Sequence, residues 1–270
     1  MSEDTGGFHY ADPSRAVLGA KPLRFSLTLL IVLLIYGLSC YFVDIDPERL
    51  WTGLPRLAHW LAKAWPPDIR DVDVLLRRAA ETVAMAVVGT TIGVVIAAPF
   101  SVLAARNITP SMTLYLPIRW FLNSLRGIDS FIFALLFVAA VGLGPFAGVL
   151  GISVHSAGTI AKLWSEAIEA VEPGPLEAAA LTGANRLKII SYALLPDVLP
   201  NLASITLYVW EFNVRSSTVL GVVGAGGIGQ ELKNSVDLLD FARLMTIVLI
   251  IVAMVTAIDQ ISAKLRQHLV

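Results

Sequence analysis

The stretch EAIEAVEPGPLEAAALTGANRLKIISYALLPDVLP, residues 166–200, decides how the rest of the chain is organised. It lies between two long apolar segments but is itself polar, with charges at Glu166, Glu169, Glu172, Glu177, Arg186, Lys188 and Asp197. Pro173 and Pro175 end one helix and fit the start of the next, because proline lacks an N–H that the first helical turn leaves unpaired anyway. A charged, proline-bounded stretch between apolar segments indicates a surface element at the membrane.

Two short helices separated by a bend are predicted within this stretch. Residues 176–182 are good helix formers, and Gly183 is a natural helix end because glycine adopts positive φ at little cost. Apolar residues then recur at helical spacing, at Leu187, Ile190 and Leu194, until Pro196 ends the second helix. A polar helical insertion held at a membrane surface predicts a docking element for a soluble partner.

The spacing within this stretch also resembles a known motif. An E-A-A triplet, three residues, a glycine and nine further residues before I-x-L-P are typical of ABC importer permeases. The matching residues are Glu177, Ala178, Ala179, Gly183, Leu195 and Pro196. Ala193 stands where the motif usually has isoleucine, which should weaken an apolar contact without abolishing docking. The flanking EPGP (172–175) and TGAN (182–185) resemble the phosphonate-importer branch. The alternative is an amphipathic surface loop of another kind of membrane protein.

Composition places the chain among polytopic membrane proteins. Of its 270 residues, 56% are hydrophobic and 15% are charged, and the mean hydropathy is +0.72. An ordinary soluble domain has about 25% charged residues. The net charge is −1, and no basic tract is long enough to indicate binding to nucleic acid. The single cysteine, Cys40, can neither pair within the chain nor anchor a metal cluster.

Six apolar segments predict six transmembrane helices. They cover residues 25–43, 79–105, 128–141, 146–165, 201–220 and 241–261. Residues 1–24 should form a cytoplasmic tail. Residues 44–78 should be a periplasmic or interfacial segment, with a tryptophan-bearing amphipathic helix near residues 50–64. Residues 106–127 are either an interfacial helix or an early start to the third span.

The charge distribution favours one orientation of these spans. Six crossings place both termini and the coupling segment, residues 166–197, on the cytoplasmic side. Most lysines and arginines of the loops then fall inside, as the positive-inside rule requires. Arg77 and Arg78 are exceptions, and three aspartates of the same segment balance them. Residues 79–270 are thus expected to form the transmembrane domain of an all-α polytopic protein.

A glycine-rich segment, GAGGIG at residues 224–229, formally satisfies G-x-G-x-x-G. A dinucleotide site would need a preceding strand and an acid about 20 residues further on. Here the segment follows an apolar span, and position 249 is Leu249. The surrounding LGVVGAGGIGQ resembles the loop after the penultimate span of phosphonate and methionine importers. It is either a flexible loop or, as we favour, an outer gate built on Gly224, Gly226, Gly227 and Gly229.

Glu211 and Arg215 are charged residues inside the fifth apolar segment. They are four residues apart and so lie on one helix face. Each charge near the centre of a bilayer costs about 2.5–3.5 kcal/mol on insertion scales, so the pair needs a reason. It either pins helix packing or lines a cavity in which Arg215 attracts an anion. The sequence WEFNVRSSTVLG, with Asn213 between the charges, resembles phosphonate permeases here.

The other polar residues of the spans predict packing roles. His155 is expected to be a packed, hydrogen-bonded residue, and Asp129 and Glu81 are expected to be acids at helix starts. The sequence contains no H-E-x-x-H, no nucleophile elbow and no G-x-x-x-x-G-K-[ST] loop. We therefore expect no enzyme activity, no bound cofactor or metal, and no ATP hydrolysis by this chain.

The resemblance, strongest over residues 166–230, implies the permease subunit of a type I ABC importer for phosphonates in a bacterial inner membrane. It implies six spans with a cytoplasmic coupling helix and a homodimer of two permease copies surrounded by lipid. It also implies two separate ATPase subunits and a periplasmic phosphonate-binding protein. The same architecture could move phosphite, phosphate or an amino acid such as methionine. An intramembrane enzyme and a standalone channel are alternatives of another class, and neither explains the docking stretch.

Overall fold

The computed structural model describes residues 21–43, 46–109 and 111–269, and every regular element within these ranges is a helix. This confirms the predicted all-α architecture. The chain divides into two units, Met1–His59 and Trp60–Val270. The predicted tail over residues 1–20 lies outside the described residues, whereas residues 21–24 already belong to the first helix.

The first unit contains α1 (Lys21–Val43) and most of α2 (Pro47–Lys63). The apolar part of α1, Phe25–Val43, has 19 residues, which is long enough for the predicted first span. At the start of α2, the side chain of Asp46 accepts hydrogen bonds from the backbone N–H of Glu48 at 2.9 Å and of Arg49 at 3.2 Å. These bonds satisfy donors that a helix start leaves free. The amphipathic helix predicted near residues 50–64 corresponds to α2.

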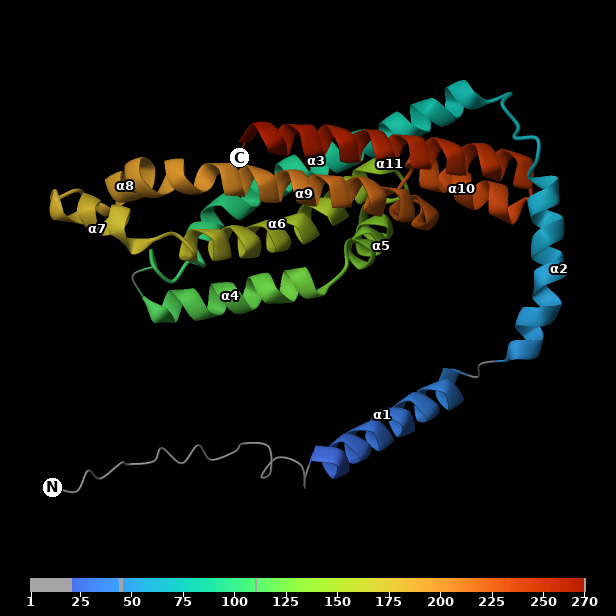
Figure 1. Cartoon of the computed structure of the whole chain (residues 1–270). Helices are drawn as coiled ribbons and strands as arrows, with labels where there is room; N and C mark the ends of the chain where they lie inside the picture. The colour runs from blue at the N-terminus through green and yellow to red at the C-terminus, as the bar shows by residue number, and fades with distance from the viewer. Residues whose placement is uncertain (1–20, 44–45, 110, 270) are drawn as a thin grey trace, which may run out of the picture. The chain divides into compact units, whose positions relative to one another are not determined.

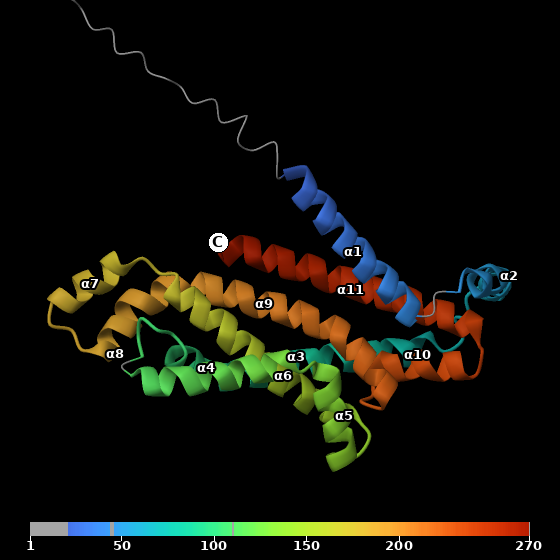
Figure 2. The same ribbon diagram turned by 90° about the horizontal axis from the view of Figure 1, so that it is seen from below.

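Five longer helices of the second unit run side by side (Figures 1 and 2). They are α3 (Val72–Leu103), α4 (Met112–Gly127), α6 (Pro145–Glu169), α9 (Leu195–Leu220) and α11 (Phe241–Leu269). The central helix is α6, which packs against α3, α4 and α9 and is more buried than the other apolar spans of the described residues.

Small residues allow α3 and α6 to approach closely. A Cβ added to Gly89 would lie 2.7 Å from the side chain of Ile152, and one added to Gly93 would lie 2.8 Å from the side chain of Ser156. In lipid, such close packing replaces the exclusion of water as the force that holds helices together.

The predicted third span, residues 128–141, is wrong in its limits. The helix found there, α5 (Ser130–Val141), has 12 residues and is too short to cross alone. It follows α4 at a bend of 84°, and both α4 and α5 pack against α6. The bend falls where Asp129 accepts a hydrogen bond from the N–H of Phe131 at 2.8 Å and so caps α5. The hydropathy of the sequence does not reveal a cap of this kind. Five described helices are long and apolar enough to cross a membrane, and six if the bent pair counts as one span.

Shorter helices lie at the two ends of the bundle (Figure 1). One end carries α7 (Pro173–Leu181), α8 (Arg186–Ile189) and the π-helical turn η1 (Ile190–Leu194). The other end carries the 3₁₀ turn η2 (Gly221–Val223) and α10 (Gly227–Asp237). The segment expected to be an outer loop, residues 221–240, is therefore mostly helical.

The prediction that Pro196 ends a helix is also wrong. Helical structure continues from α8 through η1 into α9. In η1 the N–H of Leu195 donates to the carbonyl of Ile190, five residues earlier. The wider π-helical turn accommodates the ring of Pro196, which would clash with a preceding carbonyl in a regular α-helix.

Candidate functional site

The expected docking helix projects from one end of the bundle. Every residue of α7 is exposed or half-buried, and Leu181 beyond the motif triplet is 89% exposed. Glu177 and Ala178 are exposed and Ala179 is half-buried. The α7 helix therefore presents a surface of small and apolar residues with a single charge, that of Glu177.

Gly183 forms the bend after α7 in the conformation that the sequence suggested. Its φ is +77°, in the left-handed region that favours glycine, and a Cβ added there would meet no atom within 4 Å. A substitution at Gly183 would therefore alter the surface and the backbone of the bend but not the core.

A groove of about 400 Å³ lies behind α7. Leu176, Glu177 and Ala180 of α7 line it together with residues 107–109 of the α3–α4 connection. Ile189, Ile190 and Leu194 complete the lining. Leu176 also packs against a buried cluster that includes Ala105, Ile168 and Leu194, so α7 touches the core of the bundle beside the groove.

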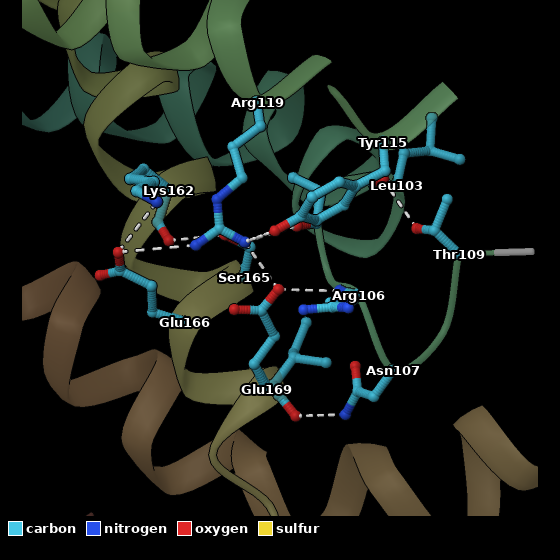
Figure 3. Close-up of polar contacts among 12 residues, drawn as sticks. Leu103, Arg106, Asn107, Thr109, Tyr115, Arg119, Lys162, Ser165, Glu166 and Glu169 are labelled. Atoms are coloured by element: carbon cyan, nitrogen blue, oxygen red, sulfur yellow. Dashed lines mark hydrogen bonds and ion pairs between the residues drawn. The ribbon is translucent and has the colours of Figure 1, made fainter. Parts of the chain in front are cut away.

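A network of charged side chains holds the bundle together beside this groove (Figure 3). Arg119 of α4 donates to Glu169, the last residue of α6, at 2.6 Å, and it also donates to the hydroxyl of Tyr115. Lys162 lies 2.9 Å from Glu166, and Arg119 lies 3.9 Å from the same carboxylate. Two cations and two carboxylates therefore balance, which lowers the cost of placing charges at this half-buried position.

The α3–α4 connection is fastened to the same network. The N–H of Arg106 donates to the carboxylate of Glu169 at 2.8 Å, and Asn107 Nδ2 donates to the carbonyl of Ile168 at 2.8 Å (Figure 3). The side chain of Thr109 donates to the carbonyl of Leu103 at 2.7 Å. These bonds fix the part of the groove lining that the α3–α4 connection provides.

Asn213 lies in the core and not beside the two charges that flank it in sequence. It is fully buried, and its Nδ2 donates to Thr90 of α3 at 2.8 Å and to Ser156 of α6 at 2.7 Å. Its Oδ1 is buried without a hydrogen-bond partner. Asn213 thus ties α9 to both neighbouring helices.

Glu211 and Arg215 form the expected ion pair, and α11 contributes two more charges. Glu211 also accepts from Arg266 at 3.0 Å, and Arg215 lies 3.5 Å from Asp259. The side chain of Arg215 is 51% exposed, whereas that of Glu211 is 12% exposed. A hollow of about 330 Å³ beside Arg215 is lined by the hydroxyl-bearing residues Thr218 and Thr256 and by apolar residues of α11.

The glycines of residues 224–229 are packed tightly against α9 and α3. A Cβ on Gly229 would lie 1.8 Å from the carbonyl oxygen of Thr218, and one on Gly227 would lie 2.4 Å from the hydroxyl of Thr82. That hydroxyl also accepts the N–H of Ile228 at 2.9 Å. Gly224 and Gly226 have φ of +90° and +80°. The interpretation as a flexible loop does not fit this packing.

Ion pairs at the same end of the bundle account for one of the outer arginines. Arg78 pairs with Glu81 at 2.9 Å and approaches Glu231 of α10 at 3.6 Å, while Arg243 of α11 pairs with Glu231 at 3.0 Å. Glu81 is therefore not a helix-start acid, because α3 begins nine residues earlier, at Val72. Nearby, a hydrogen bond from Arg70 holds the pKa of Asp68 below its ordinary value.

His155 and Asp129 lie where the sequence predicted. The Nδ1 of His155 is 2.9 Å from the carbonyl of Ile128, as expected for a hydrogen-bonded packing residue. Asp129 caps α5. Within the described ranges, no three histidine, cysteine or acidic side chains are grouped so that they could hold a metal ion.

Arg119, Lys162 and the role of Glu169 were not predicted from the sequence. Lys162 lies within an apolar span, which is a signal, since such charges are rare unless they are paired. Their partners could not be named, because Glu169 is 50 residues from Arg119 in the sequence.

The all-helical bundle with its apolar spans defines a polytopic membrane protein. A solved structure entitled "Inward facing conformations of the MetNI methionine ABC transporter" contains a chain with this fold. That chain superposes with a TM-score of 0.65 at 25% sequence identity, over 75% of this chain and 99% of its own length.

Residues 79–269 match the family described as "Binding-protein-dependent transport system inner membrane component", and the chain belongs to that family. It is a multi-pass inner-membrane protein and a transporter subunit, not an enzyme.

Three relatives are named for phosphorus oxyanions. HtxC of Stutzerimonas stutzeri, provisionally named a phosphite transport permease, is 50% identical over 247 residues, which cover 92% of this chain and 88% of HtxC. The phosphate-import permease PhnE of Mycolicibacterium smegmatis is 38% identical over 96% of this chain and 49% of its own length. PhnE2 of Escherichia coli K12, provisionally named for a cryptic phosphonate transport system, is 44% identical over 45% of this chain and 100% of its own length.

Proposed function

We propose that this chain is the permease subunit of an ATP-driven importer for small phosphorus oxyanions, with phosphonates as its substrates. The observation that carries the proposal is the 50% identity to HtxC across 92% of the chain. It agrees with the phosphonate-type sequences around the docking stretch. Because HtxC is named for phosphite, phosphite is the second candidate, and it shares with phosphonates a phosphorus bonded to three oxygens.

We propose that a separate ATPase subunit docks on α7. The exposed Glu177, Ala178 and Leu181 and the open bend at Gly183 offer a surface for it. Leu195 and Pro196 complete the motif and lie where η1 joins α9. ATP binding to two such subunits would displace α7, and the spans would follow between inward-open and outward-open states, because a ligand shifts only states that it binds differently.

A second copy of this chain is proposed to cover the charged face of α9 and α11. Arg215 and Asp259 lie within apolar spans with 51% and 43% of their side chains exposed. Exposed charges of this kind avoid lipid and face a bundle interior or a water-filled cavity. In a two-fold homodimer this face would border the shared pathway, where Arg215 and its two threonine neighbours are suited to a passing anion.

The tightly packed segment of residues 224–229 is proposed as the outer gate. It joins the outer end of α9 to α10, and α10 is held to α3 and α11 through Glu231. A periplasmic binding protein that delivers the substrate would act at this end of the bundle.

Uptake of a labelled alkylphosphonate tests the proposal. Cells that lack their own importer would receive this chain, its ATPase and its binding protein, and each component would be omitted in turn as a control. Labelled phosphite would be the second substrate, with phosphate and methionine as competitors. Uptake that requires all three components and is not reduced by either competitor supports the proposal. Uptake of methionine, or no uptake by an intact inserted complex, would contradict it.

A further inference from the structure

We propose that Arg119 and Glu169 form a clamp that makes the inner ends of α3, α4 and α6 move together with α7. Both would be positioning residues for transport, since they act through the helices and not on the substrate. The inference rests on the proposed function in one respect, namely that α7 receives the movement of an ATPase.

The clamp sits at the point where α7 joins the bundle. Glu169 is the last residue of α6, and only residues 170–172 separate it from α7. Any displacement of α7 therefore pulls first on the backbone at Glu169. Because its carboxylate is held by Arg119 at 2.6 Å, that pull passes directly to α4.

A second path to the same residue crosses the groove behind α7. Residues 107–109 line this groove together with Leu176, Glu177 and Ala180 of α7, and Ile108 and Leu176 pack against the same buried cluster. The same loop is bonded to the end of α6 through the N–H of Arg106 and the side chain of Asn107. A push by α7 on the loop and a pull on the α6–α7 connection thus converge on Glu169.

The guanidinium of Arg119 contacts several groups at once and not a single partner. Its Nη1 contacts Glu169, the hydroxyl of Tyr115 and, at 3.5 Å, the carbonyl of Ala104 at the end of α3, while Nη2 faces Glu166. The guanidinium also lies 5.2 Å from the centre of the Tyr115 ring. A planar group with several fixed donors holds its neighbours in one relative geometry, which a lysine ammonium does less well.

Contiguous hydrogen-bonded and packed groups are the physical means by which coupling travels between sites. If Arg119 is lost, α4 remains in the bundle through its apolar contacts with α6, but its geometric link to the end of α6 is gone. The variant should fold, dock its ATPase and hydrolyse ATP while it moves less substrate per ATP.

The test is carried out on the complete complex in liposomes, with substrate uptake and ATP hydrolysis measured together. For Arg119→Met we expect normal abundance and basal hydrolysis, with uptake per ATP lower by about 5-fold or more, the lower end of typical coupling between sites. Arg119→Lys should restore part of the ratio. Glu169→Gln keeps an acceptor for the N–H of Arg106 and removes the charge, so it should fall between wild type and Arg119→Met. Lys264→Met is the matched control, because Lys264 is exposed and no ion pair forms at its side chain within the described residues.

Hydrogen–deuterium exchange supplies a readout that does not depend on the substrate. In the wild-type complex, ATP should change exchange over α7 and over residues 112–119, and in Arg119→Met only the change over α7 should remain. A parallel loss of uptake, hydrolysis and abundance in Arg119→Met, or an unchanged ratio, would overturn the clamp. If ATP changes nothing at α7 in the wild type, the proposed docking fails instead, and the clamp fails with it.

Discussion

At the scale of single residues, the same amino acid type serves opposite purposes at the two ends of the bundle. Gly183 lies in open space and supplies only a backbone conformation. Gly229 lies against the backbone of α9 and supplies only the absence of a side chain. A substitution at Gly183 should therefore impair docking, whereas a substitution at Gly229 should impair folding.

Gly183→Asp should leave the protein in the membrane at normal abundance and uncouple it. A non-glycine residue at positive φ costs about 1–2 kcal/mol, too little to unfold the bundle. A negative charge at the bend would disturb the docking surface. Gly183→Asn is the matched control, because asparagine tolerates this conformation and has the same size without the charge. Uptake and abundance would be measured together, and normal uptake by Gly183→Asp would contradict the assignment of the docking site.

Asn213→Ala should weaken the packing of α9 against α3 and α6. It removes two buried hydrogen bonds and leaves Thr90 and Ser156 facing a small cavity. The expected cost is about 1–2 kcal/mol, or roughly 2–8 °C in Tm for a chain of this size. Thermal unfolding in detergent checks this, with the exposed Asn234→Ala as control. Equal Tm values for the two variants would show that the Asn213 bonds add nothing to stability.

At the scale of elements, hydropathy predicted where most spans lie but not how they bend or join. The first, fourth, fifth and sixth apolar segments each fall within a helix of the structure, and the second extends two residues past the end of α3 at Leu103. The bend between α4 and α5 depends on the cap formed by Asp129. The π-helical turn before Pro196 depends on one backbone hydrogen bond, from Leu195 to Ile190. Neither changes the apolar pattern, so neither could be predicted from it.

Contacts between charged side chains were predictable only where both partners lay close in sequence. Glu211 and Arg215 lie four residues apart, so their pairing followed from helix geometry. The pairing of Arg119 with Glu169 joins α4 and α6, which α5 separates in the sequence. No property of either residue alone identifies the other.

Gly229→Ala should prevent α10 from packing against the end of α9. The added methyl group would lie 1.8 Å from a backbone oxygen, so one of the two elements must move. Overpacking of this kind typically costs about 1–3 kcal/mol. Reduced abundance and a lower Tm are expected. Gly53→Ala in α2 is the control, since a Cβ there meets nothing within 4 Å. Wild-type stability of Gly229→Ala would show that this end of the bundle is looser than its packing indicates.

Arg215→Ala should impair uptake more than Arg215→Lys. Without the arginine, Glu211 keeps Arg266 as a partner, but Asp259 loses the cation that lies 3.5 Å from it. Lysine preserves the positive charge beside the hollow and loses only the planar geometry. Initial uptake rates at matched abundance check the order. Equal, near-normal rates in both variants would leave Arg215 without a charge role in transport.

At the scale of the whole molecule, the arrangement of the bundle predicts which parts of the chain each aqueous phase can reach. In the second unit, α7 lies at one end of the bundle and α10 at the other (Figure 1). With most loop lysines and arginines on the side of α7, the positive-inside rule places α7 in the cytoplasm and α10 outside. Of the two exceptions, Arg77 and Arg78, the second is paired with Glu81 and Glu231, so it adds little net positive charge at the outer end.

Single cysteines introduced at the two ends test this orientation. In a Cys40→Ser background, Leu238→Cys should react with a membrane-impermeant maleimide in cells whose inner membrane is intact. Leu181→Cys should react only after the inner membrane is permeabilised. Both positions are highly exposed, 77% for Leu238 and 89% for Leu181, so a difference in labelling reports the side of the membrane and not burial. The reverse pattern would place α7 outside, where no ATPase could reach it, and would remove the basis for coupling through Gly183 and Glu169 together.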